Sequence, residues 1–235
     1  MDAAPVLVTG PLGRVGTGLR RHWGDRYPLR LFDLHPAADL APHETVITDS
    51  ITDAEALRAA AEGCRAIVHL AATSDEADFL TELVPNNVVG LYNAFEAARR
   101  AGVPRLIFAS TVQVLLGYPR GTFVRDTDPV RPITRYAATK VLGEALGRYY
   151  RDRHGLEVIC LRLGSVPHPD RLTEAHRSSP LHLSPRDCAG FLAGALDASP
   201  APEEGYAIVS LTSGRGAAVR DLERAERLLG YRPVD

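Results

Sequence analysis

Tyr136 and Lys140 are four residues apart, in the segment YAATK. On an α-helix, residues at this spacing lie on one face, one turn apart, so the phenol and the ammonium can reach a common point. A phenol can take or give a proton, and a neighbouring positive charge lowers its pKa by favouring the phenolate. The pair is therefore a candidate general base or acid for proton transfer at a hydroxyl or carbonyl group.

Lys140 is also the only lysine of the chain. Lysine and arginine together number 27, and every other one is an arginine. Arginine is a planar fork that stays protonated, whereas lysine is a compact charge on a flexible stem, so the two are not interchangeable at a reacting site. The single lysine favours a chemical role for the pair. The alternative is an exposed helix that carries a Tyr and a Lys at this spacing by chance.

A glycine turn stands near the start of the chain. The apolar, β-branched run of residues 5–9 leads into Gly10, Gly13 and Gly16, and apolar residues then recur at helical spacing. Glycines permit a tight turn and a close backbone approach, and the first N–H groups of the helix attract phosphate. This strand, turn and helix predict a site for the pyrophosphate of a dinucleotide.

Asp33 follows the next predicted strand, about 20 residues after the glycine turn. An acid at that distance accepts hydrogen bonds from the ribose hydroxyls of the adenosine half of a dinucleotide, and its charge repels a 2′-phosphate. Leu34 and His35 follow it, so no arginine offsets the charge. We expect NAD, with NADP less favoured. The alternative is an acid that only ends a strand.

Strand and helix patterns alternate along the whole chain, which predicts a doubly wound parallel sheet of Rossmann type flanked by helices. Ser110 and Thr111 come at the carboxyl end of one strand, the edge at which such sheets bind ligands. Asp53 is expected to cap a helix. The expected strands are 5–9, 29–32, 45–47, 65–70, 106–109, 156–163 and 206–209, and the expected helices start near 15, 53, 82, 136, 186 and 219.

The expected helix that starts near residue 82 extends to Ala101, with Pro85 tolerated near its start and Gly102 ending it. Residues 164–185 contain four prolines and little periodicity. A loop of that length in a compact domain usually covers a site, so we expect a lid or substrate loop within a single domain of residues 1–235.

Composition and charge exclude several classes of function. The chain is 45% hydrophobic and 24% charged, with a net charge of −2 and a pI of about 6.4. No basic run suggests a nucleic acid or an anionic membrane as a partner. No signal peptide and no apolar run of membrane-spanning length are found, so we expect a soluble, cytoplasmic protein.

The cysteines and histidines show no ligand spacing. Cys64, Cys160 and Cys188 are scattered and odd in number, which is typical of small buried residues in a reducing compartment. Three of the eight histidines share the loop at 164–185 without a metal-binding pattern. We expect no metal site.

Several motifs in this order resemble the extended, sugar-modifying branch of the short-chain dehydrogenase/reductase superfamily, the NAD-dependent epimerase/dehydratase family, and within it the uronate dehydrogenase type. The residues that carry the resemblance cover nearly the whole chain. They are Thr9-Gly10-x-x-Gly13-x-x-Gly16, Asp33, His69-Leu70-Ala71-Ala72, Asn87, Phe108-Ala109-Ser110-Thr111, Tyr136-x-x-x-Lys140 and Arg162-Leu163-Gly164-Ser165, with further similarity over 87–100 and 104–111.

The resemblance implies an NAD-dependent oxidoreductase that moves a hydride between nicotinamide and a small sugar, sugar acid or other secondary alcohol or carbonyl compound. The implied catalytic residues are Thr111, Tyr136, Lys140 and Asn87. The implied cofactor-binding residues are Gly10, Leu12, Gly13, Arg14, Val15, Gly16, Asp33, Ser50, Ile51, Leu70, Ala71, Ala72, Tyr136 and Lys140. The implied substrate-binding residues are Ser74, Ser110, Thr111, Gln113, Ser165 and Arg171.

The chain departs from this family at three places. Ser50-Ile51 stands where relatives carry Asp beside an aliphatic residue, and Asp49 is one place early. Val112-Gln113 replaces the Asn-His pair of uronate dehydrogenases. The C-terminal substrate region is much reduced, which disfavours a large nucleotide sugar. Arg171 and Arg177 are both candidates to bind a carboxylate.

Other interpretations stay open. The first is a sugar epimerase or dehydratase with tightly held NAD, and the second is a non-catalytic NAD(P)-binding regulatory protein. Thr111 is equally a strand-end hydroxyl, and Asn87 a polar residue on a helix face. The family implies a homodimer through the Asn87 and Tyr136 helices, whose apolar positions are also explained by packing on the sheet. These positions are Leu91, Phe95, Leu142 and Leu146.

Overall fold

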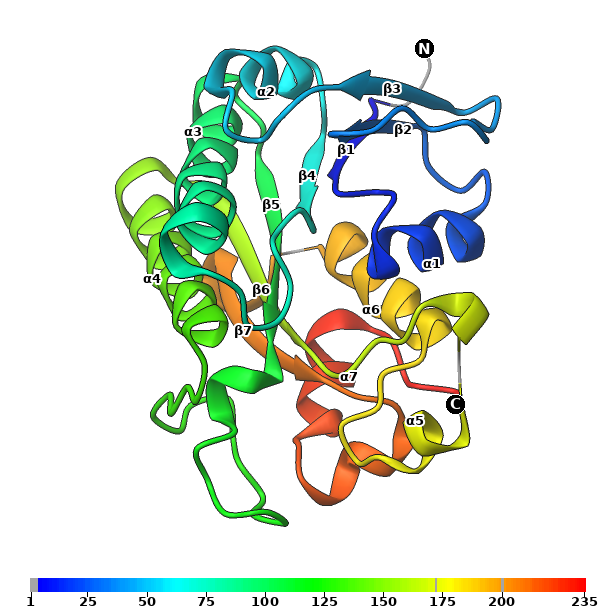
Figure 1. Cartoon of the computed structure of the whole chain (residues 1–235), viewed down its shortest axis with the longest axis vertical. Helices are drawn as coiled ribbons and strands as arrows, with labels where there is room; N and C mark the ends of the chain where they lie inside the picture. The colour runs from blue at the N-terminus through cyan, green and yellow to red at the C-terminus, as the bar shows by residue number, and fades with distance from the viewer. Residues whose placement is uncertain (1–3, 172, 200) are drawn as a thin grey trace.

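Seven parallel strands form one sheet in the order β3-β2-β1-β4-β5-β6-β7 (Figure 1). The computed structural model describes residues 4–171, 173–199 and 201–235. This is the Rossmann-type doubly wound sheet predicted from the sequence. The strands are β1 (Val6–Thr9), β2 (Leu29–Asp33), β3 (Glu44–Thr48), β4 (Ala66–His69), β5 (Arg105–Thr111), β6 (Glu157–Leu163) and β7 (Tyr206–Leu211).

The strand order reverses between β1 and β4. The chain runs outward from β1 to β2 and β3, then crosses back to β4 on the other side of β1. Loops that leave β1 and β4 at their carboxyl ends therefore diverge to opposite faces of the sheet. Such a reversal opens a crevice in which α/β proteins bind their ligands.

Helices cover both faces of the sheet because successive strand residues point to opposite sides. Val8 packs with Phe191 in one core, whereas Leu7 packs with Phe95 in the other. Figure 1 shows α1 and α6 on one side and α2, α3 and α4 on the other. The helices are α1 (Arg14–Trp23), α2 (Ala54–Ala61), α3 (Leu91–Arg100), α4 (Arg135–His154), α5 (Glu174–Ser178), α6 (Pro185–Asp197) and α7 (Leu222–Leu229).

The prediction of a helix from residue 82 differs from the structure in the first half of that helix. It begins earlier, after Asp78, whose carboxylate accepts a hydrogen bond from the Thr81 N–H. Its first twelve residues form a π-helix, η1 (Phe79–Gly90), which continues into α3. Pro85 therefore lies in the helix interior, where it has no N–H to donate, and wide π-turns are one way a helix accommodates such a break.

The other predicted helices and strands are confirmed to within a few residues. Asp53 caps α2 by accepting hydrogen bonds from the N–H groups of Glu55 and Ala56. Gly155 ends α4 in the left-handed conformation, with φ of 72°. The short 3₁₀ segments were not predicted. They are η2 (Val112–Leu115), η3 (Pro169–Arg171), η4 (Pro202–Gly205) and η5 (Gly214–Ala218).

The segment at 164–185, predicted to be a lid, contains η3 and α5, and its residue 172 lies outside the described residues. Its two ends are tied together. The Ser165 N–H donates to the Leu181 carbonyl at 2.7 Å, and the Leu183 N–H donates to the Ser165 carbonyl at 3.0 Å. The segment therefore forms a closed loop beside the carboxyl end of β6, and a lid function stays a prediction.

Across the described ranges, no helix combines the length and the apolar character needed to cross a membrane. The three cysteines are free and buried, as their scattered positions predicted.

A buried ion pair joins α4 to the carboxyl ends of β5 and β6. Arg162 donates two hydrogen bonds to the Glu144 carboxylate, at 2.8 and 2.9 Å, and Ser110 donates a third at 2.7 Å. The side chains of Arg162 and Glu144 are only 2% and 5% exposed. Removing one partner of such a pair leaves an uncompensated charge in the interior.

We expect Arg162→Met to lower the free energy of unfolding by about 3–5 kcal/mol because the Glu144 carboxylate then stays buried without a cation. Urea unfolding followed by circular dichroism measures this. The control is Arg148→Met, which removes the exposed pair with Asp152 on the same helix and should change stability by about 1 kcal/mol or less. Equal losses in the two variants would contradict the special role of the buried pair.

Candidate active site

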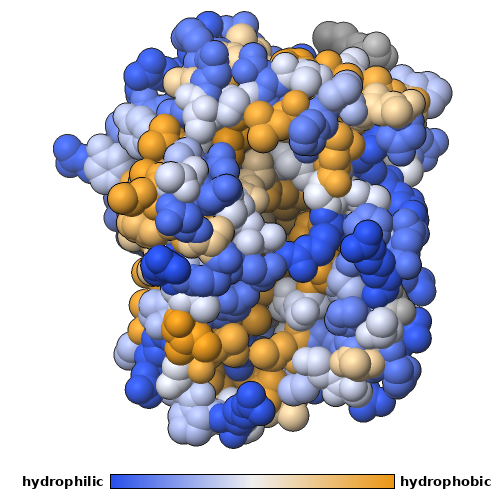
Figure 2. Space-filling model, viewed as in Figure 1, coloured by the Kyte–Doolittle hydropathy of each residue, from blue (hydrophilic) through white to orange (hydrophobic). Residues whose placement is uncertain are grey.

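Two cavities meet at the glycine turn, at the edge where the strands end. One has a volume of about 340 Å³ and the other about 410 Å³. Gly10, Gly13, Leu70 and Ala72 line both of them, so together they form one elongated groove. Figure 2 shows this face of the molecule hollowed near its middle, with apolar surface inside the hollow.

The glycine turn is compact because two backbone segments touch there. Gly10 has a φ of +70°, and a Cβ added to it would lie 2.8 Å from the Ala71 backbone. A Cβ on Gly16 would lie 2.5 Å from Pro11. Gly13 caps α1 without any side-chain hydrogen bond, which leaves the first N–H groups of the helix for a ligand. These features fit the pyrophosphate of a dinucleotide.

Asp33 lines the larger cavity, together with Ile51 and Ala71. Its carboxylate accepts hydrogen bonds from the N–H groups of Leu12 and His35, at 3.2 and 3.3 Å, which fix its orientation. A fixed carboxylate at this end of the groove fits the hydroxyls of an adenosine ribose.

Ser50, predicted to contact the cofactor, does not line the groove. The Ser50 hydroxyl pairs with the Thr52 hydroxyl at 2.7 Å, and Ser50 does not line either cavity. Asp49, one residue earlier, lines the larger cavity instead. Its carboxylate accepts a hydrogen bond from the Ser50 N–H at 2.7 Å. The acid at the adenosine end is thus shifted by one position from the family pattern.

Tyr136 and Lys140 converge in the smaller cavity, as their spacing predicted. The Lys140 Nζ lies 5.6 Å from the centroid of the Tyr136 ring and 5.0 Å from that of Phe108. It donates one hydrogen bond, to the Ala109 carbonyl at 2.9 Å. Thr134 caps their helix by accepting from the Ala137 N–H, which starts α4 one residue before Tyr136.

In the protein without cofactor the pKa of Tyr136 is raised, and its lowering beside bound NAD stays a prediction. Burial raises the pKa of Tyr136 to about 12, and the Asp75 carboxylate adds to this effect while Arg14 opposes it. Burial also lowers the pKa of Lys140 to about 7. Desolvation therefore disfavours both charged forms.

His69, at the end of β4, is buried beside Lys140 and neutral. Burial, and then the neighbouring Lys140, lower its pKa to about 3. Its Nδ1 shares a hydrogen bond of 2.8 Å with the Thr9 hydroxyl. Since Thr9 and His69 pair in register across β1 and β4, this contact joins the two strands at the point of reversal.

Thr111 and Gln113 line the smaller cavity near Tyr136. The Thr111 oxygen accepts a hydrogen bond from the Gln113 N–H at 3.2 Å, and the Gln113 side-chain carbonyl accepts from the Thr134 hydroxyl at 3.3 Å. Ser110 and Ser165 line the same cavity. The Ser110 hydroxyl, however, points to Glu144, so it supports the wall of the site.

Two further predicted residues lie outside the groove. Asn87 is buried. Its side chain accepts a hydrogen bond from the Thr73 N–H and donates to the Thr73 carbonyl and to the Thr139 hydroxyl, at 2.8, 2.9 and 3.2 Å. It therefore ties the loop after β4 to α4. Arg171 is exposed and lines neither cavity. Roles for both in catalysis or binding stay predictions.

The sequence did not indicate two features of the smaller cavity. One is Asp75, which bonds to Arg14 at the cavity's rim and has a φ of +64°. No motif marks it, because its partner is distant in sequence. The other is an apolar part of the cavity wall. The residues of that wall are Val112, Leu116, Leu163, Val166 and Leu181.

Comparison with known proteins identifies relatives of the whole chain. Residues 6–222 match the NAD dependent epimerase/dehydratase family. An NAD-dependent glucose-6-phosphate dehydrogenase of Haloferax volcanii is 32% identical over 98% of this chain and 93% of its own length. An L-arabinose 1-dehydrogenase (NAD(P)(+)) of the same organism is 37% identical over 82% of both chains.

A solved structure shares the fold over nearly all of this chain. It is a tyrosine-to-alanine variant of uronate dehydrogenase from Agrobacterium tumefaciens in complex with NAD. It superposes with a TM-score of 0.86 at 32% identity, covering 98% of this chain and 84% of the other.

The low pKa of Lys140 can be measured without assignment because the chain has one lysine. In protein labelled with [¹³C]lysine, we expect the single side-chain Cε signal to titrate with a midpoint of about 7. Burial is the cause, so the same signal in urea-unfolded protein should titrate near the ordinary value of 10.5. A midpoint near 10.5 in the folded protein would contradict the assignment.

Proposed function

The chain belongs to the NAD-dependent epimerase/dehydratase family, and from this premise we propose that it is an NAD-dependent dehydrogenase. It transfers a hydride between nicotinamide and a small sugar, sugar acid or other secondary alcohol. One observation carries the proposal: Tyr136, Lys140 and Thr111 line the same cavity as the glycine turn. Three relatives named as dehydrogenases of sugars or sugar acids support it.

Each of three residues of the cavity has a separate role in this reaction. Tyr136 accepts the proton of the substrate hydroxyl during oxidation and returns it during reduction. Lys140 supplies positive charge beside the phenol and a donor for the cofactor's ribose. Thr111 holds the substrate oxygen next to Tyr136. NAD, when bound, supplies the hydride acceptor and a positive ring whose charge favours the phenolate.

Asp33 supports NAD as the cofactor. Its carboxylate is held toward the adenosine end of the groove by two backbone N–H groups. A 2′-phosphate at that place would meet a fixed negative charge. The glycine turn, Arg14, Val15 and Leu70 would hold the rest of the dinucleotide.

Asn87 serves this reaction as a positioning residue. Its amide fixes the Thr73 backbone and also contacts the Thr139 hydroxyl, which donates to the Tyr136 carbonyl at 2.7 Å. The loop after β4 and the helix of Tyr136 are therefore held in one arrangement through Asn87. The alternative role, implied by the family resemblance, is that Asn87 takes part directly in a proton relay.

We further propose a cytoplasmic homodimer. The support is a set of apolar side chains left exposed on η1, α3 and α4. Among them Leu80 is 74% exposed, Tyr92 49% and Tyr149 50%. Leu91 and Phe95, two of the apolar positions considered for this interface, are buried against the sheet and take no part in it. The buried free cysteines favour a reducing compartment.

Net consumption of NAD distinguishes the dehydrogenase from an epimerase or dehydratase. An epimerase returns its hydride to the sugar, whereas a dehydrogenase releases NADH. With sugars, sugar acids and small secondary alcohols as substrates, we expect NADH absorbance to rise in proportion to product. Conversion of a sugar without accumulation of NADH would contradict the proposal and favour the epimerase.

Tyr136→Phe tests the base. We expect kcat to fall by a factor of about 10² or more, since the ring stays in place but has no group to move the proton. NAD binding, followed by quenching of tryptophan fluorescence, should stay within about threefold of the wild type, a difference of less than 1 kcal/mol. Undiminished turnover would refute the role of Tyr136.

A further inference from the structure

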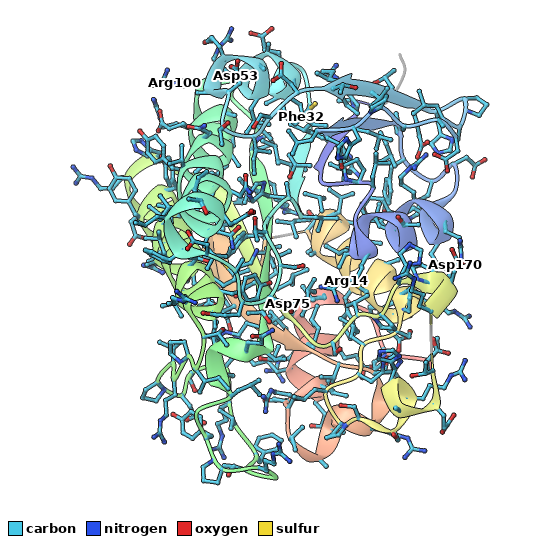
Figure 3. The ribbon with its side chains drawn as sticks, viewed as in Figure 1. Arg14, Phe32, Asp53, Asp75, Arg100 and Asp170 are labelled. Carbon is cyan, nitrogen blue, oxygen red and sulfur yellow. The ribbon has the colours of Figure 1, made fainter. Side chains whose placement is uncertain are left out.

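An ion pair lies at the rim of the smaller cavity. The Arg14 Nη2 is 3.1 Å from Asp75 Oδ2, and it also donates to the Ser74 hydroxyl at 3.1 Å. All three residues line the cavity that contains Tyr136. Figure 3 shows Arg14 and Asp75 beside each other in the middle of this face. The pair thus connects the glycine-turn helix to the loop after β4, next to the reacting phenol.

The cavity offers few positive charges to a substrate. Among the described residues that line it, only Arg14 and Lys140 are cationic. Lys140 lies at the floor, 4% exposed, and donates to the Ala109 carbonyl. Arg14 is held by Asp75. A sugar carboxylate or phosphate is usually bound by two N–H groups of one arginine, and the Nη2 of Arg14 is already engaged by Asp75 and Ser74.

The arginines of the segment at 164–185 do not contribute a positive charge to this cavity. Arg171 is exposed and lines neither half of the groove. Arg177 lines a separate cavity with Glu174 and His182, and its guanidinium lies 3.9 Å from the Glu174 carboxylate. The substrate end of the groove therefore presents the Arg14–Asp75 pair, the buried Lys140 amine and otherwise neutral groups.

Those neutral groups suit a polyhydroxylated ring. Hydroxyl and amide side chains, which can both donate and accept hydrogen bonds, come from Ser74, Thr111, Gln113 and Ser165. The same cavity also has apolar lining, with Val112 and the other residues named above, which can pack against the C–H face of a sugar.

We propose that Asp75 makes this site select uncharged sugars over sugar acids and sugar phosphates. The carboxylate holds the Arg14 guanidinium and repels a second anion beside Tyr136. This inference rests on the proposed dehydrogenase function and narrows its substrate class. It separates the chain from its relatives that act on uronates or on glucose 6-phosphate.

Matched sugars test the selection in the wild-type protein. D-glucose and D-galactose differ from glucuronate, galacturonate and glucose 6-phosphate only at carbon 6. We expect kcat/KM for NADH formation to be at least about tenfold higher for each neutral sugar, a difference of about 1.4 kcal/mol. An acid or phosphate used as well as its neutral counterpart would overturn the inference. If neither these sugars nor any other alcohol yields NADH, the proposed function itself is contradicted.

Asp75→Asn tests the residue. The amide leaves the Arg14 guanidinium without its anionic partner, so the ratio of kcat/KM for the acid to that for the neutral sugar should rise at least about tenfold. The readout is this ratio, which a general loss of structure would not raise. An unchanged ratio would overturn the assignment to Asp75.

Asp170→Asn is the matched control. Asp170 pairs with Arg21, also on α1, at the same 3.1 Å, and the exposed fractions are 51% and 64% against 49% and 64% for Arg14 and Asp75. Figure 3 shows Asp170 at the edge of the molecule, away from Arg14. We expect this variant to keep the wild-type ratio. An equal rise in both variants would mean that surface charge in general, and not Asp75, sets the preference.

Discussion

The buried ammonium of Lys140 is the constraint on which the site depends. In the described part of the chain it forms no ion pair, and its one hydrogen bond goes to the Ala109 carbonyl. Burial therefore lowers its pKa to about 7, so it gains or loses a proton near neutrality. An arginine could not do this because it stays charged at any pH that proteins meet. A lysine at this position can therefore titrate where an arginine could not.

The same burial explains how Tyr136 and Lys140 act as a unit. Each charge alone is disfavoured in the interior, which raises the pKa of the phenol and lowers that of the amine. A phenolate and an ammonium together attract each other, and the attraction is strong in a medium of low dielectric constant. In the proposed reaction, the positive ring of NAD would add to this attraction and favour the ionised pair.

Much of this arrangement could be predicted from sequence because it rests on local patterns. The glycine turn, the Asp53 cap and the Tyr136 helix each follow from residues within one or two turns of each other. What could not be predicted depends on distant contacts. Asp75 meets Arg14 across sixty-one residues. Ser110 was expected to face the substrate, but the buried Arg162 draws Glu144, and with it the Ser110 hydroxyl, into the wall of the site.

In this fold, the residues that select the substrate can therefore differ from the residues that carry out the reaction. In the proposed reaction, residues that match the family, such as Gly13 and Tyr136, bind the dinucleotide and move the proton. Val112-Gln113, which differs from the family, and Asp75 line the same cavity as Tyr136. Under the proposal made above for Asp75, charge at the rim of the cavity, and not the shared motif, decides between a sugar acid and a neutral sugar.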